Sequence, residues 1–360
     1  MNVRPAPLPP AAAGWLVAAL AAVLAGCASP PVAPPVPPAA TPLPPATGSV
    51  LGRSARMLVY LPHADEGWNA IAARFLGQAR EGWQVAQANP GLDRPQAGQP
   101  VVVPLVPPNP LGVTAAGAQG ITILCYHRVG LAVSRMEITP ARFEAQMQWL
   151  ADAGYRVVSL AEVAGFLAGR RALPPRSVAI TFDDGYQSVF RHAFPVLQRL
   201  GYPATLFVYT DFLGSRDAVT PAQMRQMAAS GLMDVQAHGK SHANLIERLE
   251  GEADSAYRHR IDRELLVPRA VLERNQAQDG GPASPVRHLA YPYGDANDTV
   301  LAAMTRNDYE LGLTVDPGTN RFYAAPLLLR RVMIYGDRDL ADFQARVQGQ
   351  TPGTRREAKP

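Results

Sequence analysis

Two adjacent aspartates follow a short apolar run in the sequence RSVAITFDDGYQ. Asp183 and Asp184 end this run and are followed by Gly185. Successive side chains of a regular strand point to opposite faces, and neighbouring carboxylates repel each other when neither has a partner. Both aspartates can therefore serve one site only if the backbone bends after Asp183 and each side chain has its own role.

Two histidines further along the chain provide partners for one of these carboxylates. His238 and His242 lie four residues apart in HGKSH, and a helical turn at this spacing would direct both imidazoles the same way. Two imidazoles and one carboxylate make a three-ligand metal site with positions open for water and substrate. The charge of a metal would also offset the repulsion between the aspartates, so that one can bind it while the other stays free beside it.

The elements that must position these residues are short apolar runs that alternate with amphipathic stretches between residues 119 and 346. This alternation predicts an α/β fold with parallel strands buried on both faces. The predicted strands lie in ITILCYH, YRVVSL, SVAITFD, ATLFVY, MDVQAH, RHLAYP, YELGLTV and LLLRRVMIY. In a barrel of parallel strands the carboxyl ends share one rim. His127, the aspartates, His238 and the segment 292–294 each follow such a strand, and we expect them to converge.

Each motif also has an ordinary structural explanation. DDG in a loop is commonly a turn or a helix cap, and two histidines four residues apart on a helix are often a surface pair. The combination of both motifs at predicted strand ends favours a functional site over these alternatives.

With these motifs, the chain resembles the polysaccharide deacetylases of carbohydrate esterase family four, the NodB-homology group. TFDDG (181–185), HGKSH (238–242) and YPYG (291–294) match the first three motifs of that family. The resemblance implies a distorted (β/α) barrel of seven to eight strands and a divalent metal, usually zinc. The implied metal ligands are Asp184, His238 and His242.

The resemblance also assigns the remaining roles. It implies that Asp183 is the general base and that the backbone amide of Tyr293 helps to hold the oxyanion. Tyr291 and Pro292 belong to the third motif and Tyr186 follows the first, and we expect all three to bind substrate.

The sequence departs from the common family pattern at two places. Ala290 stands where the third motif usually begins with an arginine that pairs with the base, and the late Leu-x-His-Asp motif that supplies the catalytic acid is missing. These departures resemble the poly-β-1,6-N-acetylglucosamine deacetylase branch. They leave the proton donor open. His127 is the candidate for donating a proton or contacting substrate, and a buried structural histidine is the alternative.

The N-terminus is typical of an exported lipoprotein. Residues 1–26 read as a signal peptide, and Leu24-Ala25-Gly26-Cys27 resembles a bacterial lipobox, which implies lipidation of Cys27. The alternative is an ordinary signal peptide with a chance cysteine. By analogy with Gram-negative lipoproteins, Ala28 favours the outer membrane, with the protein facing the periplasm.

The rest of the chain divides into four further segments around the barrel. Residues 27–55 form a Pro/Ala-rich linker, 107–118 a second linker and 347–360 a disordered tail. Between the linkers, residues 56–106 have a strand–helix–helix–strand order that resembles a LysM module. Such modules bind N-acetylglucosamine-containing glycans, so peptidoglycan is the implied partner. Trp68 and Trp83 are either sugar platforms or core residues, and their helical spacing favours the core.

The sequence therefore predicts a metal-dependent hydrolase that removes N-acetyl groups from an N-acetylglucosamine polysaccharide, with exopolysaccharide favoured and peptidoglycan next. A catalytically inactive glycan-binding envelope lipoprotein is the alternative, supported by the missing acid and by Ala290. The net charge of +4 is small and no basic stripe is interleaved with aromatics, which argues against a nucleic-acid partner.

Overall fold

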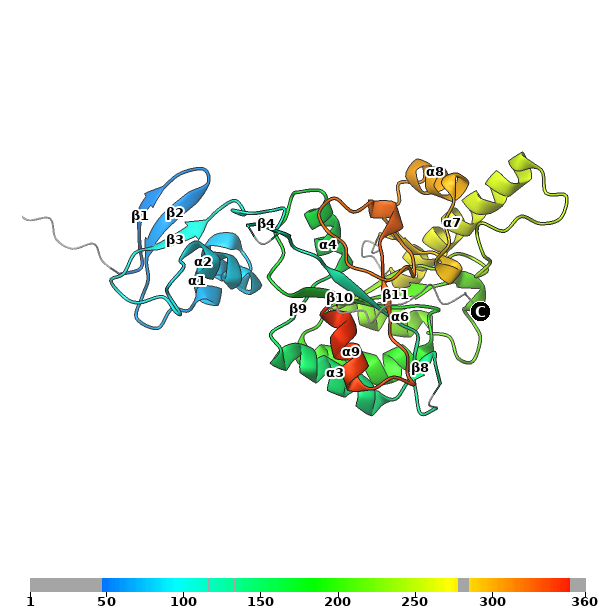
Figure 1. Cartoon of the computed structure of the whole chain (residues 1–360), viewed down its shortest axis with the longest axis horizontal. Helices are drawn as coiled ribbons and strands as arrows, with labels where there is room; N and C mark the ends of the chain where they lie inside the picture. Colours follow the sequence, from blue (N-terminus) through cyan, green and yellow to red (C-terminus); the bar gives the residue numbers. More distant parts are fainter. Residues whose placement is uncertain (1–46, 116, 133, 278–284, 350–360) are drawn as a thin grey trace, which may run out of the picture. The chain divides into compact units, whose positions relative to one another are not determined.

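The computed structural model describes residues 47–115, 117–132, 134–277 and 285–349 (Figure 1). The predicted signal peptide, Cys27, most of the first linker and the tail from residue 350 lie outside the described residues. Within the described ranges, no helix combines the length and the apolar character that crossing a membrane requires.

The N-terminal unit is a small antiparallel sheet packed against two short helices. Its strands run in the order β1-β2-β3. The elements are β1 (Ser49–Arg53), β2 (Met57–Leu61), α1 (Trp68–Leu76), the 3-10 turn η1 (Ala79–Glu81), α2 (Gly82–Ala88) and β3 (Val101–Pro104). The predicted strand–helix–helix–strand order is observed from β2 to β3. The placement of residues 49–53 in a linker was wrong, because this segment pairs with β2.

The core of this unit is built from β2, α1, α2 and β3. It is formed by Leu58, Tyr60, Ile71, Ala72, Val85, Val101 and Val103. Trp68 packs against this core, and its indole Nε1 donates a hydrogen bond to the carbonyl of Asp93 at 3.1 Å. The Asn89 side chain, at the end of α2, exchanges two hydrogen bonds with the backbone of Val102 and so fixes β3 to the helix.

The larger unit is built on a parallel sheet. The sheet runs in the order β14-β13-β12-β11-β10-β6-β15, with β9 beside β10. Its strands are β6 (Thr122–Tyr126), β9 (Arg156–Val157), β10 (Ser177–Phe182), β11 (Ala204–Val208), β12 (Met233–Ala237), β13 (His288–Ala290), β14 (Leu311–Leu313) and β15 (Val332–Met333). Each of the predicted strands is observed. The parallel pairing and the surrounding helices make this unit the expected distorted (β/α) barrel.

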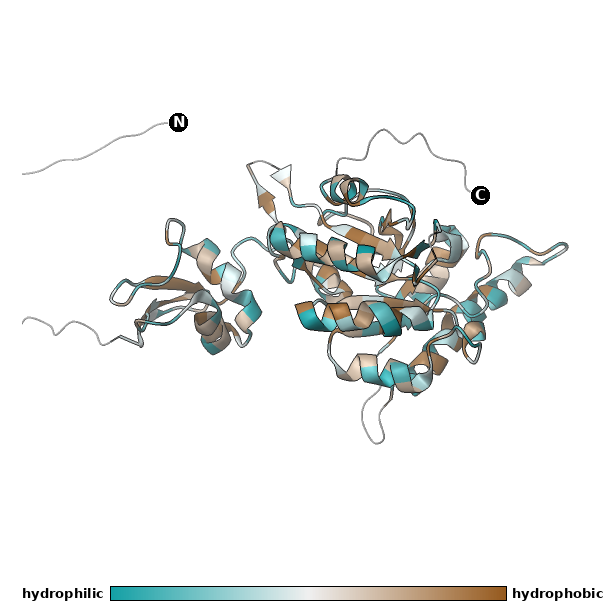
Figure 2. Cartoon of the chain, turned by 90° about the horizontal axis from the view of Figure 1, so that it is seen from below, coloured by the Kyte–Doolittle hydropathy of each residue, from teal (hydrophilic) through white to brown (hydrophobic). Residues whose placement is uncertain are grey.

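Helices connect these strands and cover the sheet. They are α3 (Pro140–Asp152), α4 (Leu160–Leu167), the π-helical turn η2 (Val189–Ala193), α5 (Phe194–Leu200), η3 (Thr210–Phe212), α6 (Pro221–Ala229), α7 (Asp254–Gln276), η4 (Pro292–Gly294), α8 (Asp298–Arg306), η5 (Pro326–Leu328) and α9 (Leu340–Val347). Two short pairs, β4 (Val113–Thr114) with β5 (Gly117–Ala118) and β7 (Arg128–Val129) with β8 (Glu137–Ile138), lie in the connections. Figure 2 shows helices that carry both hydrophilic and hydrophobic residues, as amphipathic elements packed on a core must.

Helix starts follow the capping signals in the sequence. The Thr139 side chain accepts a hydrogen bond from the Arg142 amide at the start of α3, where Pro140 takes the first helical position. Ser159 and Glu162 form a reciprocal capping box at the start of α4.

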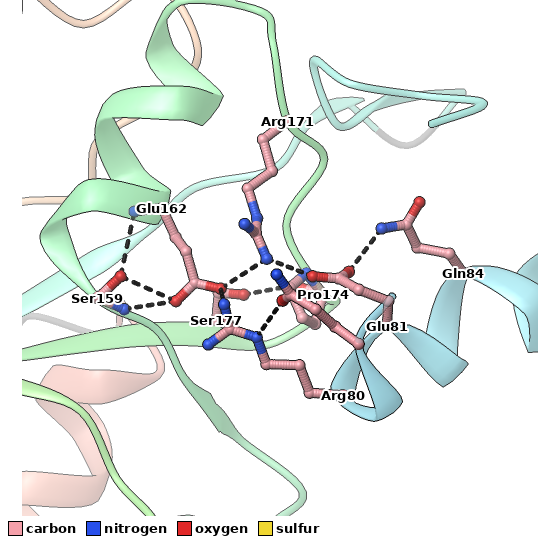
Figure 3. Close-up of polar contacts among 9 residues, drawn as sticks. Arg80, Glu81, Gln84, Ser159, Glu162, Arg171, Pro174 and Ser177 are labelled. Atoms are coloured by element: carbon pink, nitrogen blue, oxygen red, sulfur yellow. Dashed lines mark hydrogen bonds and ion pairs between the residues drawn. The ribbon is translucent and has the colours of Figure 1, made fainter. Parts of the chain in front are cut away.

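The cap residue Glu162 also takes part in an ion cluster (Figure 3). Arg171 pairs with Glu81 of η1 and places Nη2 2.9 Å from Oε1 of Glu162. Arg80 lies 3.7 Å from the same oxygen. Both glutamates are largely buried and each is balanced by guanidinium groups, which is the condition under which buried charges are tolerated.

Candidate active site

The central strand β10 delivers the two aspartates, and the backbone bends immediately after it. Asp184 and Gly185 both have left-handed backbones, with φ of 73° and 76°. A Cβ on Gly185 would meet Cγ1 of Val208 at 2.8 Å, so glycine is required by space as well as by conformation. The predicted bend is observed, and it sends the two carboxylates to different partners.

Asp184 faces the two histidines. Its Oδ1 lies 3.2 Å from Nε2 of His242 and 3.5 Å from Nε2 of His238. The other ring nitrogen of His238, Nδ1, lies 2.7 Å from the carbonyl oxygen of Ala290. A carbonyl can only accept, so Nδ1 carries the proton and Nε2 is left to face Asp184.

The two histidines are brought together by a loop, so the expectation of a helical turn was wrong. Residues 238–242 lie outside any helix, and the segment turns through left-handed backbones at Gly239 (φ 80°) and His242 (φ 59°). His238 follows β12 directly, and the turn brings the imidazole of His242 back to it. The ring centroids are 4.9 Å apart.

Asp183 is held by an arginine that the sequence analysis did not identify. Arg331 is fully buried and immediately precedes β15, and its Nη1 and Nη2 bind Oδ1 and Oδ2 of Asp183 at 2.7 and 2.8 Å. The guanidinium also donates to Thr181 Oγ1 and the Thr314 carbonyl. Asp183 is thus paired with Arg331, whereas Asp184 faces His238 and His242. The structure supplies from another segment the arginine missing at Ala290.

These partners set the protonation of both carboxylates. Burial alone would raise the pKa of Asp183, but the charge and hydrogen bonds of Arg331, together with the nearby His238 and His127, outweigh it and lower the pKa to about 2. Burial likewise opposes ionisation of Asp184, and hydrogen bonds from His238 and His242 reverse the effect, so its pKa lies far below the ordinary value. Both aspartates are therefore ionised at neutral pH.

Asp184, His238 and His242 fit a divalent metal. Their ligand atoms all lie within 4.8 Å of one another. An ionised carboxylate and imidazole nitrogens are the donor types that zinc and related ions take, and the Ala290 carbonyl orients the His238 ring from behind. The donor set identifies a candidate metal site without identifying the metal.

A second group, Cys125, His127 and Asp183, is equally compact but does not suit a cation. Both oxygens of Asp183 already bind Arg331, and a metal here would face a buried guanidinium. The Cys125 thiol lies 3.4 Å from Oδ2 of Asp183, and burial raises the pKa of that thiol well above its ordinary value. The group therefore surrounds Asp183 rather than forming a second metal site. His127 lies beside this carboxylate at the end of β6, and burial lowers the pKa of its imidazole.

Two of the predicted aromatic residues border the cluster. Tyr293 has a left-handed backbone (φ 62°), is 56% exposed, and places its ring edge to face with His242 at 5.0 Å. Tyr186 is half-buried, with the Arg128 guanidinium 3.8 Å from its ring centroid. Burial and the nearby charge of Asp184 raise the pKa of Tyr186.

The expectation that Tyr291 and Pro292 bind substrate was wrong. Tyr291 is fully buried, and its hydroxyl donates to the carbonyl of Leu327 at 2.8 Å. Pro292 is also buried. Both residues sit in the core beneath the site, because the left-handed turn at Tyr293 exposes only that side chain of the YPYG segment.

Arg331 had a signal in the sequence. An arginine inside the apolar run LLLRRVMIY can be buried only with a carboxylate partner. What the sequence could not give was which carboxylate, because Asp183 lies 148 residues away.

Comparisons with known proteins point to one family. Residues 170–312 match the family model for polysaccharide deacetylase. The poly-beta-1,6-N-acetyl-D-glucosamine N-deacetylase of Staphylococcus aureus (strain MRSA252) is 24% identical over 207 residues, which cover 55% of this chain and 69% of the relative.

Two solved structures are also similar. The structure of IcaB from Ammonifex degensii has 30% sequence identity and a TM-score of 0.54, and the match covers 65% of this chain and 98% of that one. The deacetylase PplD of Streptococcus pyogenes, solved in complex with acetate, has 26% identity and a TM-score of 0.57, with 65% and 100% covered. The chain belongs to the polysaccharide deacetylase family.

Proposed function

We propose that this chain removes N-acetyl groups from an N-acetylglucosamine polysaccharide in a reaction that depends on a divalent metal, and that the polymer is poly-β-1,6-N-acetylglucosamine. The observation that carries the proposal is the separation of the two neighbouring carboxylates. Asp184 faces two imidazoles, whereas Asp183 is bound by a buried arginine. Metal-assisted amide hydrolysis uses both a metal site and a separate ionised base, and the two carboxylates are placed for these two roles side by side.

The roles follow from these positions. Asp184, His238 and His242 would hold the metal, most simply zinc, which supplies Lewis acidity toward the acetyl carbonyl when bound. Asp183 takes a proton from the attacking water as it adds to the carbonyl carbon. A carboxylate with a pKa of about 2 is a weak base, so its effect must come from being held at the reacting water. Arg331 provides that orientation.

The remaining steps release acetate and the free amine. The backbone amide of Tyr293 would help to stabilise the oxyanion, and Tyr186 would contact the sugar at the edge of the site. When the carbon–nitrogen bond breaks, the amine nitrogen must receive a proton. We assign that proton transfer to His127, which lies beside Asp183 and can pass to the amine the proton that Asp183 took from the attacking water.

The choice of polymer rests on two observations. Ala290 replaces the motif arginine, as in the poly-β-1,6-N-acetylglucosamine branch, and the similar S. aureus protein is named for that polymer. The LysM-like unit would bind peptidoglycan and so tether the enzyme to the cell wall. We further propose that the protein is exported, carries lipid on Cys27 and faces the periplasm from the outer membrane.

Acetate release by the purified chain tests the proposal. We expect release from β-1,6-linked N-acetylglucosamine oligomers, abolition by a chelator, and recovery when zinc is added back. Matched β-1,4-linked oligomers and peptidoglycan glycan are the comparison substrates, and we expect at least tenfold slower release from both. Release from peptidoglycan alone would identify peptidoglycan, and not poly-β-1,6-N-acetylglucosamine, as the substrate. A chain that binds metal but releases no acetate from any of them would instead be a glycan-binding protein.

A further inference from the structure

The loop between His238 and His242 is an unusual carrier for two metal ligands. A helix would fix both imidazoles through its own hydrogen bonds, but this loop contains left-handed backbones at Gly239 and His242. A left-handed conformation is unfavourable for a histidine, so surrounding contacts must maintain it.

One side chain from α7 binds the middle of the loop. Oε2 of Glu264 accepts hydrogen bonds from the backbone amides of Lys240 at 2.7 Å and Ser241 at 3.0 Å. Its other oxygen, Oε1, accepts from the Ser241 hydroxyl at 2.7 Å. A single carboxylate therefore binds every residue of the loop that is neither the glycine nor a histidine.

Glu264 is buried where it contacts the loop. It is 5% exposed and lies on the inward face of α7, among Tyr257, Ile261, Leu265 and Leu272. A carboxylate on such a face is costly unless its oxygens are hydrogen-bonded. The loop amides supply those bonds, so the burial of Glu264 and the shape of the loop depend on each other.

The fit between the two is close. A Cβ placed on Gly239 would meet Oε2 of Glu264 at 3.1 Å. On its other side the loop is held by Asp211, whose amide donates to the Lys240 carbonyl at 2.8 Å and whose carboxylate binds Nζ of Lys240. The Lys240–Asp211 pair is partly exposed to solvent, whereas the Glu264 contacts are buried.

We infer that Glu264 is a positioning residue for the metal site, which sets the separation and orientation of His238 and His242 by fixing the backbone between them. The inference rests on the proposed function only in taking these histidines as metal ligands. It gives α7 a role in the reaction, because the helix carries the residue that shapes the site without touching the metal or the substrate.

Metal affinity tests this role separately from folding. Residues behind a metal ligand typically contribute about tenfold to a hundredfold in affinity, so we expect Glu264→Ala to weaken zinc binding at least tenfold in competition with a chelator. The absorption spectrum of the cobalt-loaded variant should also differ from that of the parent. Glu264→Gln should stay within about threefold of the parent, since the amide oxygen can accept from both loop amides and the amide nitrogen can donate to Ser241.

Glu273→Ala is the matched control. Glu273 lies on the same helix and accepts a hydrogen bond from a backbone amide at 3.0 Å, but that amide belongs to Val286 and not to the loop. We expect this variant to lower the melting temperature without changing zinc affinity or the cobalt spectrum.

The outcomes separate the inference from the proposed function. Zinc affinity and a cobalt spectrum unchanged in Glu264→Ala would overturn the inference, even if the metal-free variant melts earlier. A parent that binds zinc but releases no acetate would overturn the proposed function while the affinity comparison still decides the role of Glu264. A parent that binds no divalent metal would overturn both.

Discussion

Replacing Asp183 with asparagine is expected to reduce the rate of acetate release about a thousandfold while the metal stays bound. Asparagine has nearly the same shape but cannot accept a proton from water at neutral pH, and general-base catalysis typically contributes about 10²- to 10⁴-fold. Asp183 lies apart from the three candidate ligands, so the zinc content and affinity of the variant should match the parent within about threefold. Steady-state acetate release and zinc titration on the same preparation measure both quantities.

Asp217→Asn is the control for this substitution. Its carboxylate is 62% exposed and lies 3.6 Å from Arg128, near the site but outside the catalytic cluster. Exposed pairs of this kind contribute little, and kcat should stay within about threefold of the parent. The assignment of Asp183 as the base fails if Asp183→Asn keeps more than a tenth of the parental rate.

Replacing Arg331 with leucine is expected to destabilise the fold at neutral pH by about 3 to 5 kcal/mol, the usual effect of removing one partner from a buried ion pair. The substitution leaves Asp183 buried beside an apolar side chain, which favours its protonated form and removes the orientation of the base. Activity should therefore fall together with stability. Urea unfolding of parent and variant measures the free energy of unfolding.

The loss should depend on pH in a definite direction. In the parent, the pKa of Asp183 falls from 3.8 to about 2 on folding, so the stabilisation is present above pH 4 and is lost as the pH drops through 2. In Arg331→Leu the folded pKa of Asp183 should rise above its unfolded value. The folded variant would then bind the extra proton, and its stability should fall as the pH rises from 4 to 7.

Two comparisons make this prediction specific. Arg330→Leu changes the neighbouring exposed arginine and should alter stability by less than about 0.5 kcal/mol. The double variant Asp183→Asn with Arg331→Leu removes both charges and should be more stable than Arg331→Leu alone. Equal destabilisation at pH 4 and pH 7 would contradict the account of the ion pair.

The fold could be predicted from the sequence because the strands are strongly patterned. Buried parallel strands are continuous apolar runs, and four of the eight runs are followed directly by candidate site residues. The segment Ser49–Arg53 lacked this signal. It forms an edge strand that is almost entirely exposed, so nothing in its composition distinguished it from the preceding linker.

The sequence predicted most of the residues of the site, but only part of their arrangement in space. The bend after Asp183 followed from the chemistry of two adjacent carboxylates, and Gly185 made it possible. The loop shape at His238–His242 did not follow, because it depends on Glu264, which lies on a distant helix. Likewise, only the fold shows that Arg331 meets Asp183, and that Tyr291 points into the core while Tyr293 remains exposed.

The central claim is that the two neighbouring carboxylates do different work, and locating the metal tests it most directly. Crystals grown with zinc and measured at its absorption edge should give one anomalous peak at about 2.0 to 2.2 Å from ligand atoms of Asp184, His238 and His242. Asp183 should remain paired with Arg331 and make no bond to the metal. A peak bound by Asp183, or one within the group of Cys125, His127 and Asp183, would contradict the account.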